Sequence, residues 1–132
     1  MSKETYVKLN TAESLKEKGF NWDCEHYYKS NGEIVRTFHT EGSRHINSSV
    51  LYEHQCLAPT QAMAMRWFWE EKGLNINAIY GDYPSLKKAY WMPQIDSLDG
   101  CYGVDDEDFF REYDSREDCI EAALQYCLTK LI

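Results

Sequence analysis

The stretch "PTQAMAMRWFWEEKG", residues 59–73, predicts a helix and with it the centre of the fold. A proline is favoured at the start of a helix, and a glycine is favoured where a helix ends. We therefore expect the helix to begin near Thr60 and to stop at Gly73. At about 100° per residue, Trp67 and Phe68 share the wider apolar side of this helix. Both are predicted to be buried in the core.

Trp69 lies on the other side of the same helix, with Met65 one turn before it. A second apolar side must be covered by another element of the chain or by a partner, or it is left as an exposed patch. We expect Met65 and Trp69 to form a contact patch for a partner protein or a second copy of the chain. A symmetric dimer is one form of such a contact.

A shorter helix is predicted over residues 11–18, near the start of the sequence. Asn10 or Thr11 can cap its first turn. Gly19 followed by Phe20 is typical of a helix that stops at a glycine and then makes a hydrophobic contact back to its last turn.

A third helix is predicted over residues 115–131. Ser115 is placed to accept a hydrogen bond from a backbone N–H of the first turn. The apolar residues that follow it keep the i, i+3, i+4, i+7 spacing of one buried face; they are Ile120, Ala123, Leu124, Cys127, Leu128 and Leu131.

Between these helices lie runs that favour β-strands. Residues 25–38 predict a hairpin, because the Asn-Gly pair in their middle tolerates the positive φ of a two-residue turn. Residues 74–80 and 87–95 predict two strands around a turn at 81–84, and residues 108–114 predict a further strand.

This order of elements predicts an α+β fold, with about three helices packed on a mainly antiparallel sheet of four to five strands. A chain of 132 residues is the length of one domain, so we expect a single domain over residues 1–132. Pro93 favours a strand edge or a strand end. Residues 39–57 show no clear period, which indicates a functional loop or a short hidden element.

Four stretches of the chain, taken together, suggest a family. They are "LNTAESLKEKGF" (9–20), the tyrosine-rich hairpin (25–38), "APTQAMAMRWFWEEKGLNI" (58–76) and "YDSREDCIEAALQYCLTKLI" (113–132). In this order they resemble small uncharacterised proteins encoded by phages and prophages of gut bacteria. The resemblance implies an α+β fold and a phage or prophage origin, with no known activity and no catalytic residues. Trp69 and the acidic stretch before the last helix depart from the family's pattern.

Metal and cofactor sites are not indicated by the sequence. Cys24 with His26 and His54 with Cys56 could complete a tetrahedral zinc set, but each pair is only two positions apart, closer than the usual spacing of structural zinc ligands. The acidic residues around position 100 do not follow the order of a calcium-binding loop. We expect no metal and no cofactor.

An enzyme is the alternative to a binding protein. Five cysteines and four histidines allow a Cys/His nucleophilic site, as in a small hydrolase. However, none of the nucleophile, phosphate-binding, dinucleotide-binding or metalloprotease motifs is present. We name no catalytic residue, and a binding function is favoured.

The negative charge of the chain is concentrated in one region. Residues 96–118 contain ten acidic and two basic side chains, a net charge of −8, which equals the net charge of the whole chain. The rest of the chain is therefore balanced. Direct binding to nucleic acid is not expected, because phosphate contacts require clusters of lysine and arginine.

We expect this acidic segment to dock a basic protein surface, such as one that holds nucleic acid. A patch of one sign steers a partner of the other sign, and aromatic side chains supply the apolar anchor. The residues expected to take part are Asp105, Asp106, Glu107, Asp108, Phe109 and Phe110. Alternation along the predicted strand turns either Phe109 or Phe110 into the core. The alternative is that the acidic segment is only a solvated loop.

The cellular location follows from what the sequence lacks. The apolar runs are short and interrupted by charge, so neither a signal peptide nor a membrane span is expected. The odd number of irregularly spaced cysteines is typical of reduced thiols. We expect a cytoplasmic protein.

Overall fold

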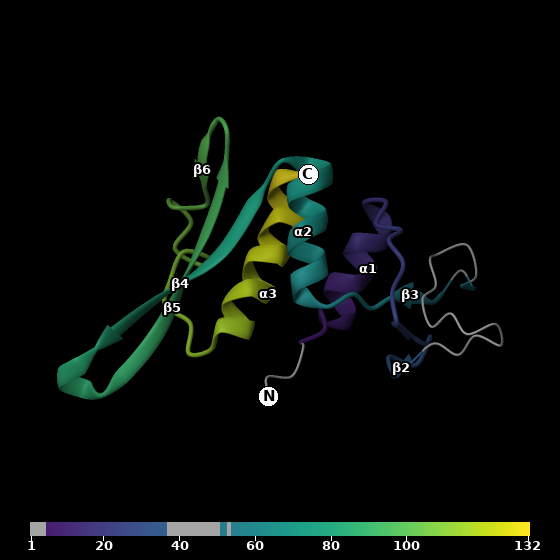
Figure 1. Ribbon diagram of the computed structural model, residues 1–132, viewed down its shortest axis with the longest axis horizontal. Helices are drawn as coiled ribbons and strands as arrows, with labels where there is room; N and C mark the ends of the chain where they lie inside the picture. Colours follow the sequence, from purple (N-terminus) through teal and green to yellow (C-terminus); the bar gives the residue numbers. More distant parts are fainter. Residues whose placement is uncertain (1–4, 37–50, 53) are drawn as a thin grey trace. The chain divides into compact units, whose positions relative to one another are not determined.

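The computed structural model describes residues 5–36, 51–52 and 54–132 of the chain (Figure 1). The chain divides after Ala62 into two compact units, residues 1–62 and 63–132. Each unit combines helix with antiparallel sheet, so the expected α+β class is confirmed. The single-domain organisation stays a prediction. Within the described residues, no helix has the length and apolar character needed to cross a membrane.

The first unit holds helix α1 (Leu9–Glu17) and a three-stranded antiparallel sheet. Its strands are β1 (His26–Tyr28), β2 (Ile34–Arg36) and β3 (Cys56–Leu57), in the order β2-β1-β3. Helix α1 packs near β3. Strand β3 is the short element hidden in the 39–57 stretch, of which residues 39–50 and 53 lie outside the described residues.

Helix α1 starts two residues earlier than expected, after Lys8, and neither Asn10 nor Thr11 is its N-cap. Its end is as predicted. Gly19 has a φ of 93°, its N–H donates to the Lys16 carbonyl, and the Phe20 N–H donates to the Leu15 carbonyl at 2.9 Å. These two bonds satisfy carbonyls that the helix end would otherwise leave unpaired.

The predicted first hairpin is present, but its turn has three residues. Tyr28 pairs with Ile34, and the Lys29 N–H donates to the Glu33 carbonyl, so residues 30–32 form the loop. Gly32 has a φ of 86°, and it is the residue in the left-handed conformation that closes the three-residue loop of a hairpin. The Asn-Gly pair therefore predicted the hairpin correctly, but it did not predict the length of the loop.

The second unit contains most of helix α2 (Gln61–Lys72), a second sheet, and helix α3 (Arg116–Tyr126). The sheet consists of β4 (Asn75–Tyr83), β5 (Lys88–Ser97) and β6 (Gly100–Tyr102), in that order. Helix α3 packs on β4 and β5. In Figure 1 these two strands form a long hairpin, and its turn lies far from β6.

The expectation of one sheet with four to five strands is wrong, because the strands of the described residues form two separate sheets of three. Residues 108–114 are not a strand. They form turns and contribute a single bridge, in which Tyr113 faces Trp91. The turn expected at 81–84 lies later, at 84–87, so that β4 runs on to Tyr83 and β4 and β5 share nine paired positions. Local patterns do not specify which strands pair, and that is why these expectations failed.

Pro93 lies within β5, the middle strand of its sheet, and not at a strand end. The backbone of Trp91 bonds to Tyr113 on the edge of β5 that faces away from β4. Because backbone groups alternate between the two edges, Pro93 faces that same edge. Strand β6 pairs only from Ile95 onward. At Pro93 no neighbouring segment of the described residues pairs with this edge of β5, so no backbone N–H is needed there. Pro93 therefore lies at a locally unpaired edge, as expected, although β5 is the middle strand of its sheet.

Helix α3 begins as predicted, since the Ser115 hydroxyl accepts from the Asp118 N–H at 3.0 Å. It continues into a π-helical turn over Cys127–Leu131. The predicted apolar face is buried at Ile120, Ala123, Leu124, Cys127 and Leu128, and Leu131 is partly exposed.

Candidate functional site

The acidic segment forms two tight turns before helix α3. The Asp106 N–H donates to the Gly103 carbonyl, and the Asp106 carbonyl accepts from the N–H groups of Phe109 and Phe110. The Asp106 carboxylate also accepts from the Asp108 N–H at 3.1 Å. The backbone of the segment is thus held by its own groups. We call residues 105–108 the acidic turn.

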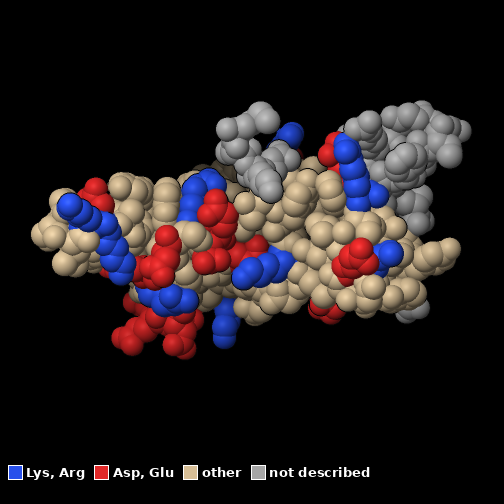
Figure 2. All heavy atoms as spheres, turned by 90° about the horizontal axis from the view of Figure 1, so that it is seen from below, with Lys and Arg blue, Asp and Glu red and all other residues tan. Residues whose placement is uncertain are grey.

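The carboxylates of the acidic turn face solvent. Asp105, Glu107 and Asp108 are exposed, and none of them forms an ion pair with any part of the chain that the structure describes. Figure 2 shows a group of acidic side chains that projects from the face that it presents, with basic side chains directly beside it. Uncompensated charge of one sign attracts a ligand of the other.

The two phenylalanines beside the acidic turn have different environments, as expected. Phe109 is buried and stacks on Tyr126, with ring centroids 4.3 Å apart. Phe110 is 37% exposed. Only Phe110 is therefore accessible to a partner. The segment is not a strand, so this division comes from the turn geometry rather than from strand alternation.

The aromatic residues of helix α2 also divide as predicted. Trp67 and Phe68 are buried, with their rings in an edge-to-face contact at 5.1 Å. Trp69 is 54% exposed and Met65 is partly exposed. Trp69 lines a depression of about 630 Å³, which does not include Met65. We call this the Trp69 depression; its apolar residues include Leu98, Tyr102 and Leu131.

Leu98 and Tyr102 were not predicted as site residues. Ser97 pairs with Gly100, so Leu98 and Asp99 form a two-residue turn between β5 and β6, and Leu98 is 99% exposed at its tip. The Asp-Gly pair at 99–100 is a strong hairpin signal that could have identified this turn.

Tyr102 connects the Trp69 depression to the acidic turn. Its hydroxyl lies 2.9 Å from the Ser97 hydroxyl. Tyr102 lines the Trp69 depression and also a second, open depression of about 710 Å³, whose wall includes the whole acidic turn. Two regions that lie more than thirty positions apart in the sequence therefore adjoin at one residue. We call the Trp69 depression and the acidic turn together the docking surface.

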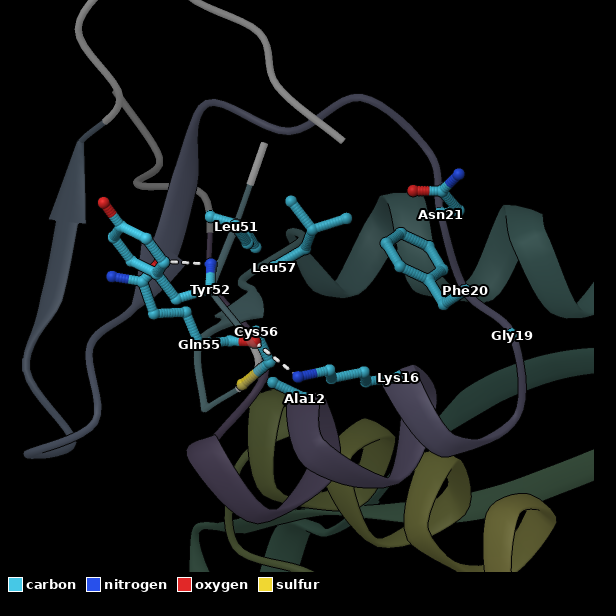
Figure 3. A pocket seen from close by; sticks show the side chains of 10 residues that line it. All are labelled: Ala12, Lys16, Gly19, Phe20, Asn21, Leu51, Tyr52, Gln55, Cys56 and Leu57. Atoms are coloured by element: carbon cyan, nitrogen blue, oxygen red, sulfur yellow. Dashed lines mark hydrogen bonds between the residues drawn. The ribbon is translucent and has the colours of Figure 1, made fainter. Parts of the chain in front are cut away.

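A separate pocket of about 380 Å³ lies in the first unit, between α1 and β3 (Figure 3). In its wall, the Lys16 ammonium donates to the Gln55 carbonyl at 2.8 Å, and the Gln55 side chain accepts from the Tyr52 N–H. Phe20 and Leu57 supply apolar lining. The sequence did not predict this pocket, because its parts come from segments whose pairing has no local signal.

Burial keeps most of the cysteines protonated. It raises the pKa of the Cys24 and Cys127 thiols to about 12 and that of Cys56 and Cys119 to about 11. Cys101 is exposed, and its pKa is raised by the hydrogen bond from its Sγ to the Asp96 carboxylate. A nucleophilic cysteine needs a lowered pKa, so these environments do not favour the Cys/His alternative.

Three of the four residues weighed as zinc ligands have other contacts. The Cys24 thiol donates to the Trp22 carbonyl, His26 packs against Tyr6 with ring centroids 4.5 Å apart, and His54 stacks on Tyr52. Among the described residues, no three His, Cys, Asp or Glu side chains come together in a group that could hold a metal ion.

No family model matches the chain, and no curated protein or solved structure is significantly similar to it. The resemblance to phage and prophage proteins therefore stays a prediction.

Proposed function

We propose that this chain is a small accessory protein of phage or prophage type that acts in the cytoplasm by binding another protein. The partner presents a basic surface, such as one that holds nucleic acid, with an apolar side chain at its centre. This proposal is supported by one observation above all, namely that Tyr102 lines both the Trp69 depression and the wall formed by the acidic turn.

The two halves of the docking surface have different physical roles. Asp105, Glu107 and Asp108 attract a basic partner over a distance of about 8 Å at physiological salt, the range over which exposed charges act. Trp69 and Leu98 offer apolar area to an anchoring side chain, which slows dissociation. Charge thus increases the rate of association, and apolar contact lengthens the life of the complex.

The experiment uses a defined probe, a lysine-rich peptide with one central leucine, and a second peptide with serine at that position. Binding is followed by titration calorimetry at low and high salt. We expect the leucine peptide to bind more tightly than the serine peptide and to weaken as salt rises.

The test variant combines Asp105→Asn, Glu107→Gln and Asp108→Asn. Asp106 is retained because its carboxylate holds the turn. The matched control, Glu13→Gln with Glu17→Gln and Glu33→Gln, removes the same charge from exposed positions of the first unit. We expect the test variant to bind about tenfold more weakly, a loss of about 1.4 kcal/mol, and the control to change little. Equal binding by the two variants would contradict the proposal.

A further inference from the structure

The turn between β4 and β5 carries the chemistry that the docking surface is proposed to bind. We call residues 84–88 the hairpin tip. Leu86 is 70% exposed at this tip, and Lys87 and Lys88 beside it are exposed too. Neither lysine forms an ion pair within the described part of the chain. The hairpin tip is thus an apolar side chain next to two unpaired positive charges.

The hairpin tip cannot reach the Trp69 depression of its own chain. Strand β5 has ten residues, and at about 3.3 Å per residue its two ends lie about 30 Å apart. The tip is joined to one end of β5, and the turn that carries Leu98 is joined to the other, as Figure 1 shows. Nine paired positions between β4 and β5 keep the hairpin extended.

We propose that the hairpin tip of one copy docks on the docking surface of a second copy, with Leu86 in the Trp69 depression and Lys87 and Lys88 against the acidic turn. The inference rests on the proposed function, because it uses the same surface. We identify the hairpin tip as the occupant because its charge complements that of the acidic turn. The tip is positive, in a chain whose net charge is −8.

The contact joins different regions of the two copies. Each copy has one tip and one docking surface, so a single contact leaves one tip and one docking surface free, either for a further chain or for a second, reciprocal contact within a two-fold pair. Association therefore increases with protein concentration and gives species of two or more chains. High salt weakens it, because the charges on both sides are exposed.

The test uses two variants of the whole chain. The tip variant carries Leu86→Ser and Lys88→Glu, and it keeps Lys87, whose backbone has a φ of 50° in the turn. The surface variant is Asp105→Asn, Glu107→Gln and Asp108→Asn. A control, Lys29→Glu, reverses a charge beside the turn of the other hairpin. Circular dichroism verifies that each variant is folded, and sedimentation velocity measures its size.

We expect the wild type and the control to grow with concentration at low salt, and each of the other two variants to remain a monomer. An equimolar mixture of the tip and surface variants should form a species of two chains and nothing larger, because each supplies the half that the other lacks. Association that is restored in this mixture indicates docking of a tip on a surface, because a general effect of the changed charges on association would persist in the mixture.

Three results would overturn the inference. A wild type that remains a monomer while still binding the leucine peptide would reject self-docking and leave the proposed function standing. A monomer that also fails to bind the peptide would reject both. A dimer that is abolished by Trp69→Asp but unaffected in the tip variant would show the symmetric contact through Met65 and Trp69 instead.

Discussion

Trp91 and Tyr113 exchange two backbone hydrogen bonds, at 2.9 Å from the Trp91 N–H and 2.8 Å from the Tyr113 N–H. This bridge attaches the residues that follow the acidic turn to the edge of β5. The Tyr113 hydroxyl strengthens the attachment by donating to the Phe109 carbonyl at 2.8 Å. The acidic turn is folded by its own hydrogen bonds, and the residues after it are attached to the sheet through Tyr113 and to helix α3 through the stacking of Phe109 on Tyr126.

The first prediction concerns this attachment. Tyr113→Phe should lower the free energy of unfolding by about 0.5–1.5 kcal/mol, because it removes one of the two hydrogen bonds that the Phe109 carbonyl accepts and leaves the one from the Arg111 N–H at 3.0 Å. The midpoint of denaturant unfolding, at an unchanged slope, measures this loss. Tyr80→Phe is the control, since the Tyr80 side chain is exposed, and it should shift stability by less than about 0.5 kcal/mol. Equal effects of the two changes would refute the structural role of the Tyr113 hydroxyl.

The second prediction compares the two tryptophans of helix α2. Trp67→Ala should destabilise the protein by about 3–5 kcal/mol, because it empties a buried volume. Trp69→Ala should leave the fold intact with a much smaller loss, because half of that side chain is exposed. Thermal and denaturant unfolding measure both. If Trp69→Ala were as damaging as Trp67→Ala, Trp69 would belong to the core and not to a docking surface.

The third prediction is a loss of stability at alkaline pH. The ordinary thiol pKa is 9.0, and burial raises that of Cys127 to about 12 in the folded protein. Between these values the unfolded chain releases a proton that the folded chain retains, so rising pH favours unfolding. One such thiol contributes a slope of about 1.4 kcal/mol per pH unit. Cys127→Ala should make the decline above pH 9 less steep, and an unchanged slope would show that this thiol is not the source.

The fourth prediction concerns thiol accessibility. A thiol reagent at mildly alkaline pH should modify Cys101 first, because the other four cysteines are buried. Mass spectrometry of the native protein should show one early adduct, which Cys101→Ser removes. Rapid modification of Cys24 or Cys56 at neutral pH would instead indicate an activated thiol and would favour the enzyme alternative.

The fifth prediction is that the purified protein holds no stoichiometric zinc and keeps its fold in a chelator. Cys24 and His26 contact Trp22 and Tyr6 and, among the described residues, belong to no group of three side chains that could hold a metal ion. Metal analysis and circular dichroism with and without chelator provide the measurement. One zinc ion per chain, with unfolding on chelation, would overturn this prediction.

The features that could be predicted from the sequence are local ones. The stop at Gly19 and Phe20, the cap at Ser115 and the buried face of helix α3 each depend on residues within one or two helical turns. The pairing of strands depends on residues far apart, and a short strand such as β3 has too few residues to show a period. For this reason we expected a single sheet where the structure has two.

Gly81 illustrates a second kind of failure. As a glycine next to Asp82 it was read as part of a turn, but it lies within β4, opposite Tyr90. A Cβ at this position would come within 2.3 Å of the Tyr90 ring, so the glycine provides space for that ring. A glycine that bends the chain and a glycine that makes room look alike in a sequence. Only part of the docking surface could be predicted. Trp69 and the acidic residues were expected to bind a partner, but Tyr102 joins them through contacts between distant residues, which no local sequence pattern indicates.

Pro93 has an effect on folding that reaches beyond its own position. On one edge of β5 it lies between Trp91, which bonds to Tyr113, and Ile95, which pairs with Tyr102. If β6 slid two residues along this edge, or if the segment around Tyr113 did, one of its carbonyls would face a nitrogen that has no hydrogen to donate. The proline thus separates two neighbours that compete for the same edge, and it makes the misregistered pairing of either one unfavourable.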